Sequence, residues 1–356
     1  MPLDPRPDLR SLSRAALDAL VLELRERPFR ARQLHRWLHL RGAATLDEMS
    51  DLPRALRAQL AERCALTTLE RAEEHRSADG TIKWKWRTAD GLPVESVYMP
   101  ETERKTLCVS SQAGCAMGCT FCLTATMGLL RNLTPGEIVD QVHRANRRLV
   151  ELGEGEGARP LTNLVFMGMG EPLANFENLE AALAILLSED GPNFSHRHVT
   201  VSTSGLAPMI RRLGEETQVK LAVSLNATTD EVRSRIMPIN RRYPIAELLR
   251  ACRAFPMKQG RRITFEYVML GGVNDTDEDA ARLARILDGI PSKVNLIPYN
   301  ENPGLALRAP EPSRVERFRD RLVAAGITAV VRKSRGRDIA AACGQLAAAP
   351  PAAGSR

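Results

Sequence analysis

The sequence predicts an α/β fold, a partial (β/α)6 barrel preceded by an N-terminal helical accessory domain and a β-hairpin extension. Three observations lead to this prediction. From about residue 105 onward, six short β-rich runs alternate with amphipathic helical patterns, which is typical of a parallel sheet. A complete barrel of this kind needs eight units, so six units predict a barrel that stays open on one side. The 356 residues are 44% hydrophobic and 26% charged, as expected for a globular chain of about two domains.

The first part, residues 1–75, is expected to form the helical domain. Leu17, Val21 and Leu24 recur at helical spacing, as do apolar residues within 34–38 and 52–60, and this period places them on one face of each helix. Arginines are dense in this part. Its polar face is therefore either an ordinary solvated surface or a surface that faces RNA.

Residues 76–100 are expected to form the β-hairpin extension. Apolar and basic residues alternate along its first strand, so the two kinds point to opposite faces. The apolar residues are Ile82, Trp84 and Trp86, and the basic ones are Lys83, Lys85 and Arg87. Asp90 and Gly91 supply the turn. A cationic face of this kind can follow a phosphate backbone, although an ordinary half-exposed hairpin explains the same pattern.

The barrel is assigned to residues 101–340. Its expected strands span residues 106–110, 163–167, 198–202, 220–224, 263–269 and 293–297. The expected helices span residues 135–150, 179–187, 207–213, 245–255, 277–287 and 313–325, and a short apolar run at 328–332 follows the last helix. The remaining residues, 341–356, hold Cys343 and a tail rich in Ala, Pro and Gly that is expected to be disordered.

Charge and composition limit the range of functions. The chain has 50 Lys and Arg against 43 Asp and Glu, a net charge of +7, which permits a polyanionic partner without requiring one. Aromatic residues are only 4% of the chain, which argues against broad base-stacking surfaces. No apolar run approaches the roughly 18 residues that a membrane-crossing helix needs, and the first residues lack the pattern of a secretory signal. We expect a cytoplasmic monomer that does not contact membranes.

Three of the seven cysteines lie within eight residues. Cys115, Cys119 and Cys122 have C-x3-C-x2-C spacing and follow the first expected barrel strand. Three thiolates this close repel one another, and a bound metal removes that repulsion. A structural zinc ion needs a fourth ligand, normally from a second Cys or His pair, and no such pair follows in the sequence. A [4Fe–4S] cluster with three cysteines keeps one iron open to another ligand. A chance group of thiols is the remaining alternative.

This pattern resembles the radical S-adenosylmethionine superfamily. The resemblance implies that the three cysteines ligate one [4Fe–4S] cluster, whose open iron binds S-adenosylmethionine and whose electron cleaves it to a 5′-deoxyadenosyl radical. Active sites of βα arrays lie at the carboxyl ends of the strands. A Gly-Glu-Pro segment there resembles the one that holds the methionine amino group, and other strand ends offer groups suited to ribose, carboxylate and adenine. The expected cofactor-binding residues are Gly170, Glu171, Ser202, Ser224, Leu225, Asn226 and Asn300.

The resemblance narrows to the RlmN-type methyltransferases and covers nearly the whole chain. The resemblance rests on segments that lie before the cysteine motif or end at its first cysteine, and on segments that follow the motif. The former are Phe29-Arg-Ala-Arg-Gln-Leu-His-Arg-Trp37, Glu95-Ser-Val-Tyr-Met-Pro100 and Cys108-Val-Ser-Ser-Gln-Ala-Gly-Cys115. The latter are Met167-Gly-Met-Gly-Glu-Pro172, Met237-Pro-Ile-Asn-Arg241, Asn295-Leu-Ile-Pro-Tyr-Asn300 and Ala341-Ala-Cys-Gly-Gln-Leu346. That family methylates carbon 2 of an adenine in 23S ribosomal RNA, and some members also methylate transfer RNA.

The resemblance implies catalytic roles for Glu95, Cys343 and Cys108. Cys343 takes a methyl group from one S-adenosylmethionine. A second S-adenosylmethionine yields the radical that removes a hydrogen atom from this S-methyl group. The methylene radical adds to carbon 2, and Glu95 takes the carbon 2 proton. Cys108 then attacks the sulfur of Cys343, which forms a disulfide and frees the RNA. The implied electron donor is a flavodoxin-type reductase system, and external reduction resets the disulfide.

Other functions stay open at this point. A closely related family methylates carbon 8 of adenine with the same two-cysteine logic, and pocket chemistry predicted from the sequence does not separate the two carbons. A non-catalytic iron–sulfur or zinc protein that binds RNA would need neither the Cys108 and Cys343 pair nor the Gly-Glu-Pro segment. The expected phosphate contacts are the N-terminal helices, the basic face of the hairpin and the basic residues within 332–337. Cys64 and Cys252 are expected to be structural.

Overall fold

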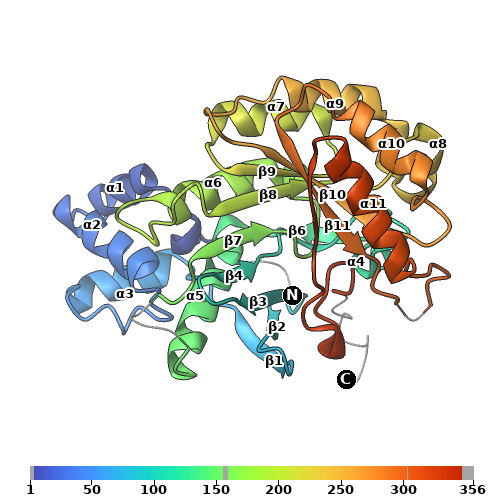
Figure 1. Cartoon of the computed structure of the whole chain (residues 1–356). Coiled ribbons are helices and arrows are strands. Elements are labelled where there is room, and N and C mark those ends of the chain that lie inside the picture. The colour runs from blue at the N-terminus through green and yellow to red at the C-terminus, as the bar shows by residue number, and fades with distance from the viewer. Residues whose placement is uncertain (1–3, 155–158, 303, 347–356) are drawn as a thin grey trace.

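A ten-stranded sheet organises the molecule (Figure 1). The computed structural model describes residues 4–154, 159–302 and 304–346, so the tail expected to be disordered, 347–356, lies outside the described residues. The strand order is β1-β2-β3-β4-β7-β8-β9-β10-β11-β12. Among the helices within the described ranges, none is both long and apolar enough to cross a membrane.

Parallel strands form the wall of the partial barrel. They are β4 (Lys105–Cys108), β7 (Asn163–Phe166), β8 (Val199–Thr203), β9 (Lys220–Ser224), β10 (Ile263–Met269), β11 (Ser292–Pro298) and β12 (Thr328–Val331). The first six correspond to the predicted strands. β12 adds a seventh, because the run after the last helix pairs in parallel with β11. Within the described residues β12 has no second neighbour, so the wall is open on one side, as predicted.

The predicted hairpin is present and continues the barrel sheet. β2 (Ile82–Arg87) and β3 (Pro93–Pro100) are antiparallel, and β3 pairs with β4. Trp84 and Trp86 are buried in the main core. A further strand, β1 (Glu70–Arg76), pairs with β2 and was not predicted, because its residues are polar on both faces. Such a sequence suits an exposed edge strand. The domain boundaries at 75 and 100 stay predictions.

Helices cover the outer face of the parallel strands. They are α5 (Pro135–Glu151), α6 (Phe176–Leu187), α7 (Ala207–Glu216), α8 (Asp230–Ile236), α9 (Ile245–Arg253), α10 (Asp277–Ile286) and α11 (Pro312–Ala324). α5 begins with a capping box in which Thr134 and Glu137 bond to each other's backbone N–H groups. Its residues Ile138, Val142 and Leu149 are buried in the main core, which fixes this helix against the sheet.

The N-terminal helices form a separate cluster beside the sheet (Figure 1). They are α1 (Arg14–Glu23), α2 (Phe29–His35), the π-helix η2 (Arg36–Leu40) and α3 (Arg54–Arg63). Arg10 joins this cluster to α5: its buried guanidinium donates to the carbonyl oxygens of Leu38 and Ala43 and lies 3.3 Å from Asp140. A buried charge with these partners holds the cluster in one position relative to the barrel.

Candidate active site

Two short strands hold the cysteine loop closed. β5 (Gln112–Gly114) and β6 (Leu129–Asn132) are antiparallel, and the N–H of Cys115 donates to the carbonyl oxygen of Gly128 at 2.8 Å. Gly114 has a φ of +77°, and a Cβ there would lie 1.9 Å from that oxygen, so only glycine fits. The short helix α4 (Leu123–Thr126) starts directly after Cys122. The strands and α4 therefore fix the backbone path of the loop.

The three loop thiols lie near enough to affect one another's ionisation. Burial raises the pKa of Cys115 to about 12, and the charge of Cys122 adds to the shift. Burial and the charges of the other two thiols also raise the pKa of Cys119. Within the described residues, no three His, Cys, Asp or Glu side chains gather closely enough to hold a single metal ion. Three thiols spaced along one loop fit a polynuclear iron–sulfur cluster, in which each thiolate binds a different iron, better than they fit zinc.

The Gly-Glu-Pro segment follows β7 and packs against β5. Gly170 has a φ of +97°, and a Cβ there would lie 2.5 Å from the Cβ of Gln112. The buried carboxylate of Glu171 accepts hydrogen bonds from the N–H groups of Leu173 at 3.1 Å and Ser204 at 2.6 Å. Burial raises the pKa of Glu171, and these bonds oppose the shift. Glu171 thus links the ends of β7 and β8, and its role toward an amino group stays a prediction.

Two serines lie at the end of β8. Ser202, a predicted site residue, is buried within the strand. Ser204, just beyond the strand, was not among the predicted residues. Its buried hydroxyl lies beside the carboxylate of Glu171 and helps to lower the pKa of that group, so the end of β8 presents polar groups next to Glu171. The Ser-Thr-Ser sequence could have indicated Ser204, because residues two apart in a strand point to the same side.

The predicted turn after β9 is held by a buried arginine. Arg233 of α8 donates to the carbonyl oxygens of Ser224 at 3.1 Å and Leu225 at 2.9 Å, and to that of Ser204 at 2.7 Å. Burial lowers its pKa to about 10. Asn226 has a φ of +56°, and its side-chain oxygen accepts from the N–H of a β10 residue at 2.8 Å. These contacts align the ends of three strands. The helical pattern around Arg233 gives no sign of this role.

The segment that carries Cys343 lies across the carboxyl-terminal end of the barrel. Hydrogen bonds from the cysteine loop and from the residues after β11 hold its backbone. The donor and acceptor pairs are Asn300 Nδ2 with Cys343 O (3.5 Å), Asn302 Nδ2 with Gly344 O (3.3 Å), Leu123 N with Gly344 O (2.8 Å) and Thr124 Oγ1 with Leu346 O (2.6 Å). Asn300, predicted to bind the cofactor, therefore contacts the segment that carries the predicted methyl carrier.

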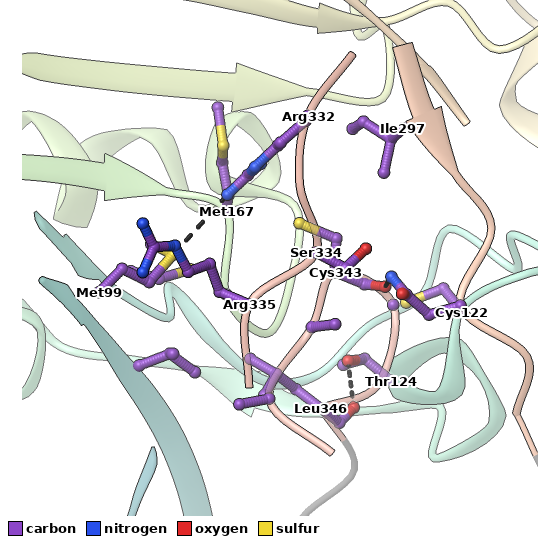
Figure 2. A pocket seen from close by; sticks show the side chains of 17 residues that line it. Met99, Cys122, Thr124, Met167, Ile297, Arg332, Ser334, Arg335, Cys343 and Leu346 are labelled. Carbon is purple, nitrogen blue, oxygen red and sulfur yellow. Dashed lines mark hydrogen bonds between the residues drawn. The ribbon is translucent and has the colours of Figure 1, made fainter. Parts of the chain in front are cut away.

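Beneath this segment is a cavity of about 80 Å³, here named the thiol cavity (Figure 2). Cys108 at the end of β4, Cys122 of the cysteine loop and Cys343 all line it. Apolar side chains make up much of the remaining wall, among them Met99 and Met167. The structure thus brings together three cysteines that are distant in the sequence, while their chemical roles stay predictions.

Arg332 is a cation of the thiol cavity. Its guanidinium donates to the sulfur of Met99 at 3.7 Å (Figure 2). Burial raises the pKa of the Cys343 thiol, and the charge of Arg332 opposes that shift. Burial also raises the pKa of Cys108 to about 12. Because Arg332 follows β12 directly, it lines the interior beside Cys343, and contact of the basic residues within 332–337 with phosphates stays a prediction.

Glu95 lies on β3, outside the wall of the thiol cavity but linked to it. Lys83 makes the link: its Nζ lies 3.6 Å from a carboxylate oxygen of Glu95 and donates to the carbonyl oxygen of Ala340 at 3.2 Å. Lys83 is 9% exposed, so it is not on an open surface. The basic face of the hairpin is therefore not free of acidic partners, and its contact with phosphates stays a prediction. Its other members are also paired, Lys85 with Glu73 at 2.9 Å and Arg87 with Glu70 at 3.6 Å.

Known proteins resemble this chain in sequence and in fold. Residues 109–284 match the family model of the radical SAM superfamily, and residues 7–66 match the ribosomal RNA large subunit methyltransferase N-terminal domain. The crystal structure of a radical SAM methyltransferase from Sphaerobacter thermophilus is 50% identical and superposes with a TM-score of 0.90, covering 95% of this chain and 98% of that one. The fold and the loop define a radical SAM enzyme, a class that uses S-adenosylmethionine and a [4Fe–4S] cluster.

Curated relatives identify the family. The dual-specificity RNA methyltransferase RlmN of Anaeromyxobacter dehalogenans (strain 2CP-C) is 78% identical over 345 residues, which is 97% of this chain and 93% of the relative. RlmN of Geobacter sulfurreducens (strain ATCC 51573 / DSM 12127 / PCA) is 52% identical over 344 residues, with 97% and 93% covered. This chain belongs to the RlmN family of dual-specificity RNA methyltransferases.

Proposed function

We propose that this chain methylates carbon 2 of an adenine in 23S ribosomal RNA and in transfer RNA, by way of a methyl group carried on Cys343. The observation that carries the proposal is the common wall of the thiol cavity, where Cys108, Cys122 and Cys343 meet. The relatives are named dual-specificity RNA methyltransferases, which supports two kinds of RNA substrate. Carbon 2 lies between two ring nitrogens and is too electron-poor to attack a sulfonium methyl group, so the reaction needs a carrier.

The carboxyl ends of the strands would hold the cofactors. Cys115, Cys119 and Cys122 would ligate the single [4Fe–4S] cluster, which supplies the one-electron chemistry that removes a hydrogen atom from the S-methyl group. The buried hydroxyl of Ser204 and the predicted groups at the ends of β7, β8, β9 and β11 would orient S-adenosylmethionine. Those groups are Gly170, Glu171, Ser202, Ser224, Leu225, Asn226 and Asn300. Two molecules of S-adenosylmethionine are consumed in each turnover.

Cys343 acts first, as a nucleophile. Its thiolate attacks the methyl carbon of one S-adenosylmethionine, so that a sulfur–carbon bond forms and S-adenosylhomocysteine leaves. Only the thiolate is reactive, and burial raises the pKa of Cys343. The charge of Arg332 opposes that shift and so favours the reactive form. Arg332 is therefore a positioning residue for this step.

Glu95 and Cys108 complete the reaction. Once the Cys343 methylene carbon has bonded to carbon 2, the adduct gives the carbon 2 proton to Glu95 and loses one electron, for which the oxidised [4Fe–4S] cluster held by the three loop cysteines would be the acceptor. Lys83 keeps the Glu95 carboxylate in place from 3.6 Å. The Cys108 thiolate then attacks the Cys343 sulfur, the sulfur–carbon bond breaks, and the released carbon takes up a proton to become the methyl group. An external thiol reductant resets the disulfide, and a flavodoxin-type reductase system would supply electrons.

The test is an anaerobic assay of the full chain after iron–sulfur reconstitution. The protein is incubated with S-adenosylmethionine, dithionite and either a transfer RNA transcript or a 23S ribosomal RNA fragment, and the nucleosides are analysed by mass spectrometry. We expect 2-methyladenosine from both RNAs. Formation of 8-methyladenosine would show the carbon 8 reaction instead. A protein that binds RNA but never cleaves S-adenosylmethionine would be a binding protein.

Cysteine variants test the carrier mechanism. Cys343→Ala should abolish RNA methylation and carry no S-methyl group on the protein. Cys108→Ala should accumulate a covalent adduct between protein and RNA, because the adduct cannot be released. Cys252→Ala is the matched control, since Cys252 is buried on α9 in the main core, and it should retain methylation. Methyl transfer by Cys343→Ala would overturn the mechanism.

A further inference from the structure

A second cavity, much larger than the thiol cavity, lies inside the barrel near the amino-terminal ends of its strands. It has a volume of about 1090 Å³ and is bounded by the first residues of β4, β7, β9 and β10 and by the loop at residues 256–262. We name it the basic lumen. Met99, Met167, Arg332 and Arg335 line both cavities. The basic lumen therefore reaches from the amino-terminal opening of the barrel to the wall of the thiol cavity.

Polar side chains line part of the inner wall of the basic lumen. Closed βα barrels fill their interior with branched apolar side chains, whereas here polar residues of neighbouring strands lie side by side. The facing pairs are Thr106 with Asn163, Thr200 with Lys220, and Thr264 with Lys293. All six residues line the cavity. A hollow, polar interior is suited to a hydrophilic ligand.

Positive charge dominates this wall. Ten of the lining residues are Lys or Arg, and only Glu101 and Glu266 are acidic. Within the described residues, none of the ten lies within 4.0 Å of a carboxylate oxygen. Arginines elsewhere are often paired, as Arg211 is with Glu215 at 2.7 Å. The protein thus gathers ten cations here with only two carboxylates in the same wall, neither of them in direct ion-pair contact.

Two residues show that the positive charge of these cations is only partly compensated. Partial desolvation lowers the pKa of Lys220, and the positive charges of Lys293, Arg104 and Arg261 lower it further. On the loop at 256–262, one guanidinium nitrogen of Arg261, Nη2, is buried and has no hydrogen-bond partner in the described part of the chain. Repulsion among like charges and an unsatisfied buried donor are both relieved when an anion binds.

We propose that the basic lumen binds a phosphate-rich anion. Arginine and lysine together match phosphate oxygens by bidentate and point-charge contacts, and the cavity has room for several phosphate groups. Two sources carry this chemistry: the backbone of RNA, in which case the inference rests on the proposed function, and a free polyphosphate or nucleotide. The shared wall at Arg332 places such an anion next to the cavity of Cys108 and Cys343.

The test measures binding of inorganic tripolyphosphate to the full chain by isothermal titration calorimetry at fixed ionic strength. The variant is Lys220→Glu/Lys293→Glu, two exposed lining residues. We expect at least a tenfold loss of affinity. The matched control is Arg250→Glu/Arg317→Glu, which changes the net charge equally at exposed positions on α9 and α11, and it should bind within twofold of the parent. Failure of the parent to bind, or an equal loss in the control, overturns the inference.

A second arm distinguishes the two sources. Binding of a labelled transfer RNA transcript is followed by fluorescence anisotropy without S-adenosylmethionine. If the lumen holds RNA, Lys220→Glu/Lys293→Glu weakens this binding too and flattens its salt dependence. If transfer RNA binding is unchanged while tripolyphosphate binding is lost, the ligand is a free anion. The neutral variant Lys220→Gln/Lys293→Gln should give a smaller loss in the affected assay.

The outcome is independent of methylation. A chain that methylates RNA but never binds tripolyphosphate removes this inference and leaves the proposed function intact. A chain that binds tripolyphosphate through Lys220 and Lys293 but methylates neither RNA supports this inference and contradicts the proposed function. Thermal melting of each variant checks that the fold is retained.

Discussion

The basic residues of β2 and those of the basic lumen differ in whether a carboxylate lies next to them, which decides whether their charge is available to an anionic ligand. Lys83, Lys85 and Arg87 of β2 each lie within 4.0 Å of a carboxylate oxygen, at 3.6, 2.9 and 3.6 Å. The ten basic residues of the lumen have no carboxylate at that distance in the described residues. The acids that pair with β2 come from β1 and β3, which flank it. Alternation along a strand identifies a basic face, and the neighbouring strands decide whether its charge is available to a ligand.

The largest effect is expected at Lys83, the most buried of the three basic residues of β2. Lys83→Met removes both the ion pair with Glu95 and the hydrogen bond to Ala340. We expect the free energy of unfolding to fall by about 2–3 kcal/mol and RNA methylation to slow at least tenfold, because Glu95 loses the positioning contact that Lys83 provides. Urea denaturation and nucleoside analysis measure the two effects.

Lys85→Met is the control for that prediction. Lys85 pairs with Glu73 at a more exposed position, where an ion pair contributes about 0.2–1 kcal/mol. We expect its methylation rate to match that of the parent. If Lys85→Met were as damaging as Lys83→Met, the pairing of Lys83 with Glu95 would have no special role.

Arg332 is expected to give the next largest effect, since it lines both cavities. Arg332→Met removes the positive charge that opposes the raised pKa of Cys343. A charged contact of this kind contributes about 1.5–3 kcal/mol, so methylation of Cys343 should slow by roughly 10- to 100-fold. Mass spectrometry of the reconstituted protein after a pulse of S-adenosylmethionine measures this step without RNA.

Two further variants sharpen the Arg332 result. Arg332→Lys keeps the charge and should recover most of the rate. Arg335→Met removes another cation of the same two cavities and should leave Cys343 methylation within about threefold of the parent. Equal loss in Arg332→Met and Arg335→Met would mean that overall charge, and not the position of Arg332, controls the thiol.

The sequence could predict what depends on period and spacing. Six barrel strands, the hairpin and the cysteine loop follow from apolar alternation, helical periodicity and the C-x3-C-x2-C motif. β1 could not be predicted, because Glu70–Arg76 has no apolar face and forms only where β2 offers an open edge. The positions of Arg332 and Arg233 depend on long-range packing: each is one arginine among many in the sequence, and only the folded chain places it beside Cys343 or below the end of β9.

A third group of buried basic side chains lies between the N-terminal helices and α5, and these side chains are histidines. His39 is fully buried between His35 and His143, with ring centroids 4.8 and 6.2 Å away, and neither of its ring nitrogens has a hydrogen-bond partner in the described residues. Burial, the other two histidines and Arg10 lower its pKa well below the ordinary value. Burial, Arg10, Arg144 and Arg159 do the same for His143. The folded protein therefore keeps both rings neutral.

Acid should therefore weaken the fold at this contact. The unfolded chain takes up protons near pH 6.5, while the folded chain resists protonation, so stability is fully present above that pH and is lost as the pH falls below it. Each unit of difference in pKa corresponds to about 1.4 kcal/mol. We expect a melting temperature several degrees lower at pH 5.5 than at pH 7.5. His39→Phe should reduce this difference, whereas the exposed His75→Phe should not, and an unchanged difference in His39→Phe would contradict the prediction.

The smallest effect is expected on RNA binding through β2. In Lys85→Glu/Arg87→Glu the two altered cations are ones that acids of β1 already neutralise, so few phosphate contacts can be lost. We expect the affinity for a transfer RNA transcript to change by no more than about twofold. Each lost phosphate contact lowers the slope of log affinity against log salt by about 0.7–0.9, and we expect that slope to stay constant. A slope reduced by one or more would show that this face contacts RNA despite its ion pairs. The ion pairs of the RNA-free protein would then not predict which basic residues, those of β2 or those of the basic lumen, bind phosphate.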